Sequence, residues 1–278
     1  MTTSSYLVCA TPRSGSTLLC EGLKATGIAG RPEEYFEADP ATGRPPRPQD
    51  YLRGAGDPDV LALLGDATPP APPRYSSLAG VDSYAEHLDR ARRWGTTPNG
   101  VFGAKLMWDH VCRLQQLAGE PGLTPLELLA ELFDEPCYVW VRREDVVRQA
   151  VSLWRAMQTQ SWRADRPGAA SAERRPRYSF AALRHLVARL NDHDARWARL
   201  FATGDTPVLA VTYEQLTADL AGAVGRTLDH IGVQSQDDRG HAAPRMRRQA
   251  DELSEEWVIA YARDSAADTE REPLPTAP

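Results

Sequence analysis

What the sequence lacks narrows the class of protein before any motif is considered. It lacks a run of about 18 apolar residues, the length a membrane-spanning helix needs. It also lacks a basic segment ahead of its first apolar run, which a signal peptide requires. With 38 acidic against 32 basic residues, it has no basic surplus for general nucleic-acid binding. These absences predict a cytoplasmic protein with no membrane span and no nucleic-acid partner.

Cysteine and lysine are also scarce. The 4 cysteines form no CxxC pair and no metal-ligand spacing, so the sequence predicts reduced thiols and no metal site. Lys24 and Lys105 are the only lysines among the 32 basic residues. In a chain that otherwise uses arginine, each of these lysines is a candidate functional residue.

Short apolar runs that end in turn residues alternate with amphipathic segments along the 278 residues. The runs at 6–10, 101–107, 137–141 and 207–211 have the length and composition of buried parallel strands. Helices are predicted near 16–26, 57–64, 83–94, 126–133, 142–162, 180–201, 220–231 and 254–262. This alternation predicts an α/β fold with a parallel sheet flanked by helices. We expect one domain over residues 1–268 and a disordered tail over 269–278.

Polar clusters follow three of the predicted strands: TPRSGST after 6–10, RRED after 137–141 and TYE after 207–211. Because ligands bind beyond the carboxyl ends of parallel strands, these clusters predict a binding site at one sheet edge. TPRSGST precedes a helix, which Ser14 or Ser16 is predicted to cap, and helix amides at such a position favour an anion. The cluster therefore resembles a phosphate loop that lacks the GxxxxGK[ST] lysine.

These motifs resemble those of the Stf0 family of sulfotransferases. The resemblance covers nearly the whole chain, through YLVCATPRSGSTLL, ATGIAGRPEEYF, TPNGVFGAKLMW, DVVRQAVSLWRAMQTQSW and RQADELSEEWVIAYARD. It implies a P-loop-like, PAPS-dependent sulfotransferase fold. It further implies 3′-phosphoadenylyl sulfate (PAPS) as sulfuryl donor and adenosine 3′,5′-bisphosphate as product. The implied acceptor is a hydroxyl of a carbohydrate or glycosylated small metabolite, and the implied assembly is a homodimer.

The resemblance assigns the donor site to nine residues: Arg13, Ser14, Gly15, Ser16, Thr17, Arg143, Ser152, Tyr213 and Arg248. Arg13 and the amides at the helix start would stabilise charge on the leaving phosphate oxygen, without a metal. Arg143 and Ser152 are implied to bind the 3′-phosphate, with Ser152 as an ordinary helix residue the alternative. Tyr213 would lie near the adenine or be a buried tyrosine bonded to a carbonyl, and Arg248 would close over the nucleotide.

The catalytic residues implied by the resemblance are Glu34, Arg13 and Lys105, with Glu34 as general base. The adjacent Glu33 and burial beside an aromatic pair predict a raised pKa for Glu34. Lys105 interrupts an apolar strand, so it contacts either the transferred sulfuryl group or an ion-pair partner such as Glu34. The six histidines fall on polar or helix-like stretches, which predicts surface positions for them.

The acceptor site is assigned to seven residues: Pro12, Arg31, Glu33, Glu34, Tyr35, Tyr51 and Trp108. Trp154 and Trp162 are further candidates for stacking on a sugar, with a position in the helix core as the alternative for Trp154. Pro12, Arg31 and Tyr51 replace residues that hold the sugar in family members that modify trehalose, so trehalose is not favoured. Arg31 suits an acceptor that carries a carboxylate or phosphate.

Two other functions fit parts of the sequence. A P-loop kinase-like phosphotransferase would need a loop lysine and acidic magnesium ligands, where the loop has Arg13. A non-catalytic nucleotide-binding protein would keep the anion-binding loop but not the base.

Overall fold

A computed structural model describes residues 5–39, 42–55, 58–64, 75–81, 83–118, 122–162, 175–203, 206–234 and 251–271. The chain divides into two compact units. The first comprises Met1–Arg47, Pro69–Glu144 and Asn191–Arg245, and the second comprises Pro48–Thr68, Asp145–Leu190 and Met246–Pro278. The last helix, α10 (Glu252–Arg271), continues past residue 268, where the sequence predicted a disordered tail to begin.

The first unit contains a four-stranded parallel sheet. Its strands are β1 (Ser5–Ala10), β2 (Phe102–Met107), β3 (Cys137–Arg142) and β4 (Val208–Thr212), in the spatial order β2-β1-β3-β4. Every residue of β1 is buried, because β1 lies inside the sheet and both of its faces are covered. This explains why its sequence is a continuous apolar run instead of an alternating one. The predicted α/β class and the four predicted strands are confirmed.

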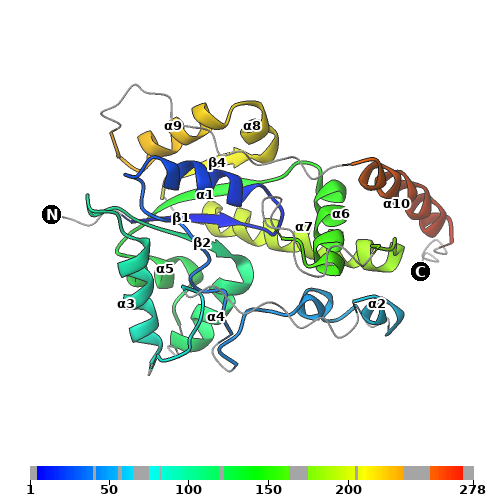
Figure 1. The fold of residues 1–278 in the computed structure, drawn as a ribbon, viewed down its shortest axis with the longest axis horizontal. Helices are drawn as coiled ribbons and strands as arrows, with labels where there is room; N and C mark the ends of the chain where they lie inside the picture. The colour runs from blue at the N-terminus through cyan, green and yellow to red at the C-terminus, as the bar shows by residue number, and fades with distance from the viewer. Residues whose placement is uncertain are drawn as a thin grey trace, which may run out of the picture. The chain divides into compact units, whose positions relative to one another are not determined.

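Helices cover both faces of this sheet (Figure 1). One face, which includes Tyr6 and Val8, packs on α1 (Ser16–Ala25), α8 (Tyr213–Ala218) and α9 (Leu220–His230). The opposite face, which includes Leu7 and Cys9, packs on α3 (Tyr84–Gly95), α4 (Trp108–Ala118), α5 (Pro125–Phe133) and the C-terminal part of α7 (Phe180–Ala202). Successive side chains of β1 therefore point alternately into two separate hydrophobic cores.

The second unit is helical in its described residues. It contains a 3-10 helix (Pro48–Leu52), α2 (Pro58–Ala62), α6 (Val146–Thr159), the first part of α7, and α10. Ion pairs join α6 to α10, with Arg148 Nη1 2.6 Å from Glu255 Oε2. Trp154 is fully buried in this core and its indole N–H donates to the Arg177 carbonyl at 2.9 Å. Of the two interpretations of Trp154, the core position is therefore the one present in the structure.

Sequence reasoning missed α4 and α8. Each helix begins at the residue that follows a strand, Trp108 after Met107 and Tyr213 after Thr212, with no intervening turn. Without glycine or proline at the junction, the strand pattern conceals the helix start. The capping box of Thr212 and Gln215 is the signal that would have revealed α8.

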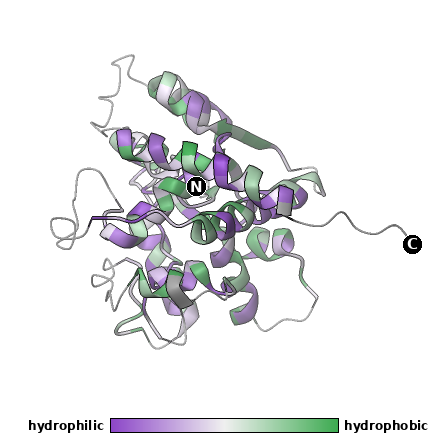
Figure 2. Ribbon diagram, turned by 90° about the vertical axis from the view of Figure 1, so that its right-hand side faces the viewer, coloured by the Kyte–Doolittle hydropathy of each residue, from purple (hydrophilic) through white to green (hydrophobic). Residues whose placement is uncertain are grey.

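The described helices mix hydrophobic and hydrophilic residues along their lengths (Figure 2). Among them, none has both the length and the apolar character needed to cross a bilayer.

Trp197 links the last residue of β1 to the hydrophobic core, and substitutions of Trp197 test how much this link stabilises the protein. Its indole N–H donates to the carbonyl of Ala10 at 3.1 Å, and its ring packs edge-on against Trp108 with centroids 5.1 Å apart. We expect Trp197→Ala to lower the free energy of unfolding by about 3–5 kcal/mol. Trp197→Phe should cost less, about 1–2 kcal/mol, because it loses the hydrogen bond but keeps a ring. Urea denaturation measures both, and equal losses in the two variants would contradict this account.

Candidate functional site

The TPRSGST loop joins β1 to α1 through two residues in the left-handed region. Arg13 has φ 65° and Gly15 has φ 89°. A Cβ on Gly15 would lie 2.8 Å from Cδ2 of Tyr213, so the position needs glycine for space as well as for conformation. Arg13 has a side chain and still adopts this conformation, at a cost on the order of 1 kcal/mol. Strain of this kind, held in place by surrounding structure, concentrates at binding loops.

Gly15 is the N-cap of α1, and no side chain caps that helix. The predicted capping by Ser14 or Ser16 is therefore wrong. Ser14 is instead fully buried, and within the described structure its Oγ has no hydrogen-bond partner. The first amides of an α-helix likewise have no partner inside the helix. The loop thus offers a buried hydroxyl and helix-start amides to an anion.

Two arginines lie beside this loop. Arg143 stacks on Tyr213, with its guanidinium carbon 4.3 Å from the ring centroid, and its Nη1 donates to the Arg13 carbonyl at 3.5 Å. Burial and the neighbouring Arg143 lower the pKa of Arg13 to about 10, so Arg13 remains cationic at neutral pH. Two cations held together against their repulsion favour a multiply charged anion. The Tyr213 ring lies beside Gly15 and under the Arg143 guanidinium, so it helps to hold both in place.

Lys105 connects the start of α1 to the Pro-Glu-Glu loop. It lies on β2, is 4% exposed, and points to the sheet face that α1 covers. Its Nζ lies 2.6 Å from Glu34 Oε1 and donates to Thr17 Oγ1 at 3.0 Å. Of the two predicted roles for Lys105, the ion pair with Glu34 is the one present in the structure.

The ion pair sets the ionisation of Glu34. Burial disfavours its charged form, but Lys105 and His110 outweigh burial and lower the pKa of Glu34 below its ordinary value. The predicted rise in the pKa of Glu34 is therefore wrong, because the sequence did not reveal which cation would face it. The carboxyl group whose pKa is raised is instead that of Glu37, where burial and the charge of Glu34 bring the pKa to about 8.

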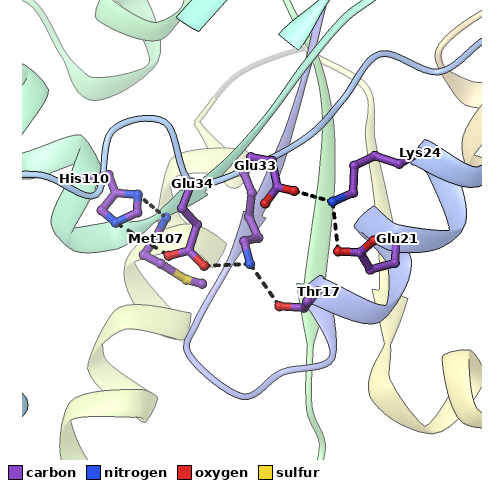
Figure 3. A network of polar contacts seen from close by, with 8 residues as sticks. Thr17, Glu21, Lys24, Glu33, Glu34, Met107 and His110 are labelled. Carbon is purple, nitrogen blue, oxygen red and sulfur yellow. Dashed lines mark hydrogen bonds and ion pairs between the residues drawn. The ribbon is translucent and has the colours of Figure 1, made fainter. Parts of the chain in front are cut away.

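Glu33 is held by the chain's other lysine. Lys24 on α1 pairs with the Glu33 carboxylate and also binds Glu21 at 2.8 Å (Figure 3). The Lys105 amide donates to the Glu33 carbonyl at 2.9 Å, which fastens the loop backbone to β2. Burial and Glu33 raise the pKa of the nearby Tyr75. Both lysines of the chain thus bind the two adjacent glutamates. Sequence reasoning singled out Lys24 by its rarity but did not identify its partners, and it missed Tyr75.

His110 is the main residue that sequence reasoning misplaced. It is buried on the first turn of α4, its Nδ1 accepts the Met107 N–H at 3.2 Å, and its Nε2 lies 4.0 Å from Glu34 Oε2. Burial lowers its pKa to about 4. The predicted surface position is wrong for His110, and also for the buried His87 and His193. His110 follows Lys105 by five positions across the strand–helix junction, a spacing that sequence patterns do not flag.

Two predicted acceptor residues are largely buried. Tyr35 is 1% exposed and its hydroxyl donates to the Arg31 carbonyl at 2.6 Å. Trp108 is 8% exposed and packs against Trp197. Little of either ring reaches solvent, so both pack mainly against the protein, and the acceptor contact assigned to Tyr35 and Trp108 stays a prediction. Arg31 is exposed and Pro12 is half-buried in the same unit as the loop.

The remaining predicted residues lie elsewhere. Ser152 is on α6 and Tyr51 is in the 3-10 helix, both in the second unit. The Tyr51 ring packs against Trp162, with centroids 5.9 Å apart. Arg248 lies outside the described residues. The roles assigned to Ser152, Tyr51 and Arg248 stay predictions.

The arrangement combines two chemical capabilities in the first unit. The loop with Arg13 and Arg143 can bind an anion, and Glu34, with a side chain 25% exposed, is a carboxylate that can take a proton. Lys105 joins the two. In the part of the chain that the structure describes, no three His, Cys, Asp or Glu side chains converge to hold a metal ion.

Known proteins resemble this chain over nearly its whole length. Residues 5–264 match the family model described as Stf0 sulphotransferase. The trehalose 2-sulfotransferase of Mycobacterium tuberculosis is 40% identical over 98% of this chain and 97% of its own. That of Mycolicibacterium smegmatis is 37% identical over 95% and 97%. The solved sulfotransferase domain from a Synechococcus olefin synthase aligns with 98% of this chain and 96% of its own at 16% identity and a TM-score of 0.39, which supports no functional argument.

Glu37 makes the stability of the protein depend on pH. Because its folded pKa of about 8 exceeds the unfolded value, its contribution is full below about pH 4.5 and is lost as pH rises through 8. Each unit of pKa shift corresponds to about 1.4 kcal/mol. We expect Glu37→Gln to flatten this fall in unfolding free energy between pH 5 and 8.5 (~1 kcal/mol or more).

Urea denaturation across that pH range measures the effect. The control is Glu131→Gln on the exposed face of α5, which should leave the pH dependence unchanged. Identical pH profiles for the Glu37 variant and the unmodified protein would contradict the prediction.

Proposed function

Since this chain belongs to the Stf0 family of sulfotransferases, we propose that it transfers a sulfuryl group from PAPS to a hydroxyl of a carbohydrate or glycosylated small metabolite. The observation that carries the proposal is the bridge made by Lys105, 2.6 Å from Glu34 and 3.0 Å from Thr17. It keeps a carboxylate able to take the acceptor proton beside the helix start that suits an anionic donor.

The loop residues fit the donor's phosphates. Gly15 leaves room that a Cβ would fill, and the buried Ser14 Oγ is an orphaned polar atom among the described residues. Arg13 and Arg143 supply charge for a phosphosulfate that carries no bound metal. We assign Arg13 and the helix-start amides of Ser16 and Thr17 to the leaving phosphate oxygen, where negative charge develops during transfer. Arg143 is assigned to a second phosphate of the donor.

The donor supplies an activated sulfuryl group, and the chain's residues handle the proton and the charges. As the acceptor oxygen bonds to sulfur, the bond from sulfur to the bridging phosphate oxygen breaks, and its electron pair leaves with the bisphosphate. The acceptor proton passes to Glu34. Oε2 is the oxygen suited to receive it, because Oε1 is engaged by Lys105. Lys105 is assigned to the sulfuryl oxygens.

The lowered pKa of Glu34 fits this role in an indirect way. It keeps the carboxylate ionised at neutral pH and ready to accept a hydrogen bond from the acceptor. If Lys105 shifts its contact toward the sulfuryl group, Glu34 loses its counter-ion and its affinity for a proton rises. Base strength would then increase as the transfer begins, which favours the transition state over the resting site.

For the acceptor, we assign only a chemical class. The two relatives are named for trehalose, which supports a sugar-containing acceptor. Arg31 is exposed two residues before Glu33, and its charge suits an acceptor with a carboxylate or phosphate. Pro12 has no side-chain hydrogen-bond donor for a sugar hydroxyl. Trehalose itself is not the favoured acceptor, and the homodimer and cytoplasmic location stay predictions.

Donor binding separates this proposal from a kinase-like function. We expect calorimetry to detect binding of PAPS and adenosine 3′,5′-bisphosphate, and weaker binding of ATP with magnesium. Arg13→Ala should weaken bisphosphate binding about 10–100-fold, the effect of losing a charged hydrogen bond. Arg93→Ala, on an exposed position of α3, is the control and should bind normally. Tighter binding of ATP with magnesium would favour the kinase-like alternative.

Turnover separates an enzyme from a binding protein. Glu34→Gln should reduce release of adenosine 3′,5′-bisphosphate from PAPS and acceptor by about 100-fold or more, since it removes a general base. PAPS binding should persist in this variant. Glu131→Gln is again the control, because its exposed side chain lies on α5. Full turnover in Glu34→Gln would exclude Glu34 as the base.

A further inference from the structure

We propose that His110 is a positioning residue for Glu34, holding the second carboxylate oxygen toward the acceptor while Lys105 holds the first. The proposal rests on the proposed function, in which Glu34 takes the acceptor proton. The two contacts approach Glu34 from different elements. Lys105 on β2 lies 2.6 Å from Oε1. His110 on α4 lies 4.0 Å from Oε2, and Figure 3 shows this contact between the two labelled side chains. Together they restrict rotation of the carboxylate.

The backbone selects the tautomer of His110. Its Nδ1 accepts the Met107 N–H at 3.2 Å, so that nitrogen carries a lone pair and not a proton. A neutral imidazole then carries its proton on Nε2, the nitrogen that faces Glu34. Met107 is the residue before α4, and His110 is in the first turn, so this contact also fixes the ring at the helix start as a capping side chain does.

His110 remains neutral, which suits a positioning role. The charged groups facing it are Glu34 on the loop, Lys105 on β2, and Asp109 and Arg113 on its own helix. Burial opposes protonation more strongly than the carboxylates favour it, and lowers the pKa of His110 to about 4. At neutral pH the ring presents an N–H dipole to Glu34 and does not compete for the proton that Glu34 takes.

The separation of 4.0 Å has a chemical consequence. It is longer than an N–H···O hydrogen bond, which spans about 2.7–3.2 Å. Oε2 is therefore attracted and oriented by the Nε2–H dipole without being occupied by a hydrogen bond from it. Its lone pair remains available to the acceptor hydroxyl, whereas Oε1 is occupied by Lys105. The two oxygens of Glu34 thus have different tasks.

Two substitutions separate this role from a purely structural one. Asparagine places its amide oxygen near the Nδ1 position, so His110→Asn keeps an acceptor for the Met107 N–H and loses the donor toward Glu34. Glutamine reaches the Nε2 position, so His110→Gln keeps a donor toward Glu34 and loses the helix-start contact. Thermal unfolding of both variants, with PAPS affinity measured by calorimetry, establishes that the protein tested is folded and binds its donor.

We expect His110→Asn to lower kcat on the order of 10-fold, because small misplacement of a reacting group is costly. The acid limb of its kcat/KM profile should move to higher pH, because the Nε2–H dipole that favours the ionised form of Glu34 is lost. PAPS affinity should be unchanged. His110→Gln should recover most of kcat and return the acid limb toward its original position.

A structural role alone would lower the unfolding temperature while leaving kcat per folded protein and the acid limb unchanged, and that result would overturn the proposal. Failure of His110→Gln to restore kcat while His110→Asn retains it would also overturn it. Glu34→Gln measured in parallel separates this failure from failure of the proposed function. If Glu34→Gln loses turnover and His110→Asn keeps it unchanged, only the role of His110 is rejected. If Glu34→Gln keeps turnover, Glu34 is rejected as the base.

Discussion

The ion pair between Lys105 and Glu34 is the interaction on which the rest of the site depends. Lys105 is almost fully buried, and a buried ammonium without a partner is strongly destabilising. The register of β2 against β1, with Lys105 opposite Val8, turns its side chain to the face that α1 covers. From there the ammonium reaches both Thr17 and Glu34. The position of the loop over the sheet and the ionisation of Glu34 follow from this one placement.

The use of lysine at this point has a physical reason. An ammonium is a compact charge with three donors that can point in different directions, whereas a guanidinium is a planar fork suited to bidentate partners. Lys105 joins a carboxylate to a hydroxyl on a different element, and Lys24 joins Glu33 to Glu21. The TPRSGST loop and its neighbour carry the other cation, because the guanidinium groups of Arg13 and Arg143 have the planar faces and several donors that suit the phosphate-like groups of the proposed donor.

Local sequence patterns determined much of the fold and only part of the site. The four strands were predictable because buried parallel strands are continuous apolar runs, and α4 was not because it begins at Trp108 directly after a strand. The position of the TPRSGST loop could be predicted because its sequence places a glycine between an apolar strand and the start of a helix. The pKa of Glu34 depends on Lys105 and His110, which lie more than 70 positions further along the chain, so no local pattern contains it. Pairing across strands decides such contacts.

The left-handed conformation of Arg13 has a consequence for how this protein can change. Glycine would adopt φ 65° without strain, so replacing Arg13 with glycine relieves a local cost and removes the loop's only cation at once. Selection for heat resistance alone would therefore reward the loss of the charge, while selection for anion binding would retain the strain. Under the proposed function, the stability of the fold and the binding of an anion therefore place opposite demands on this residue, and the sequence has the residue that favours binding.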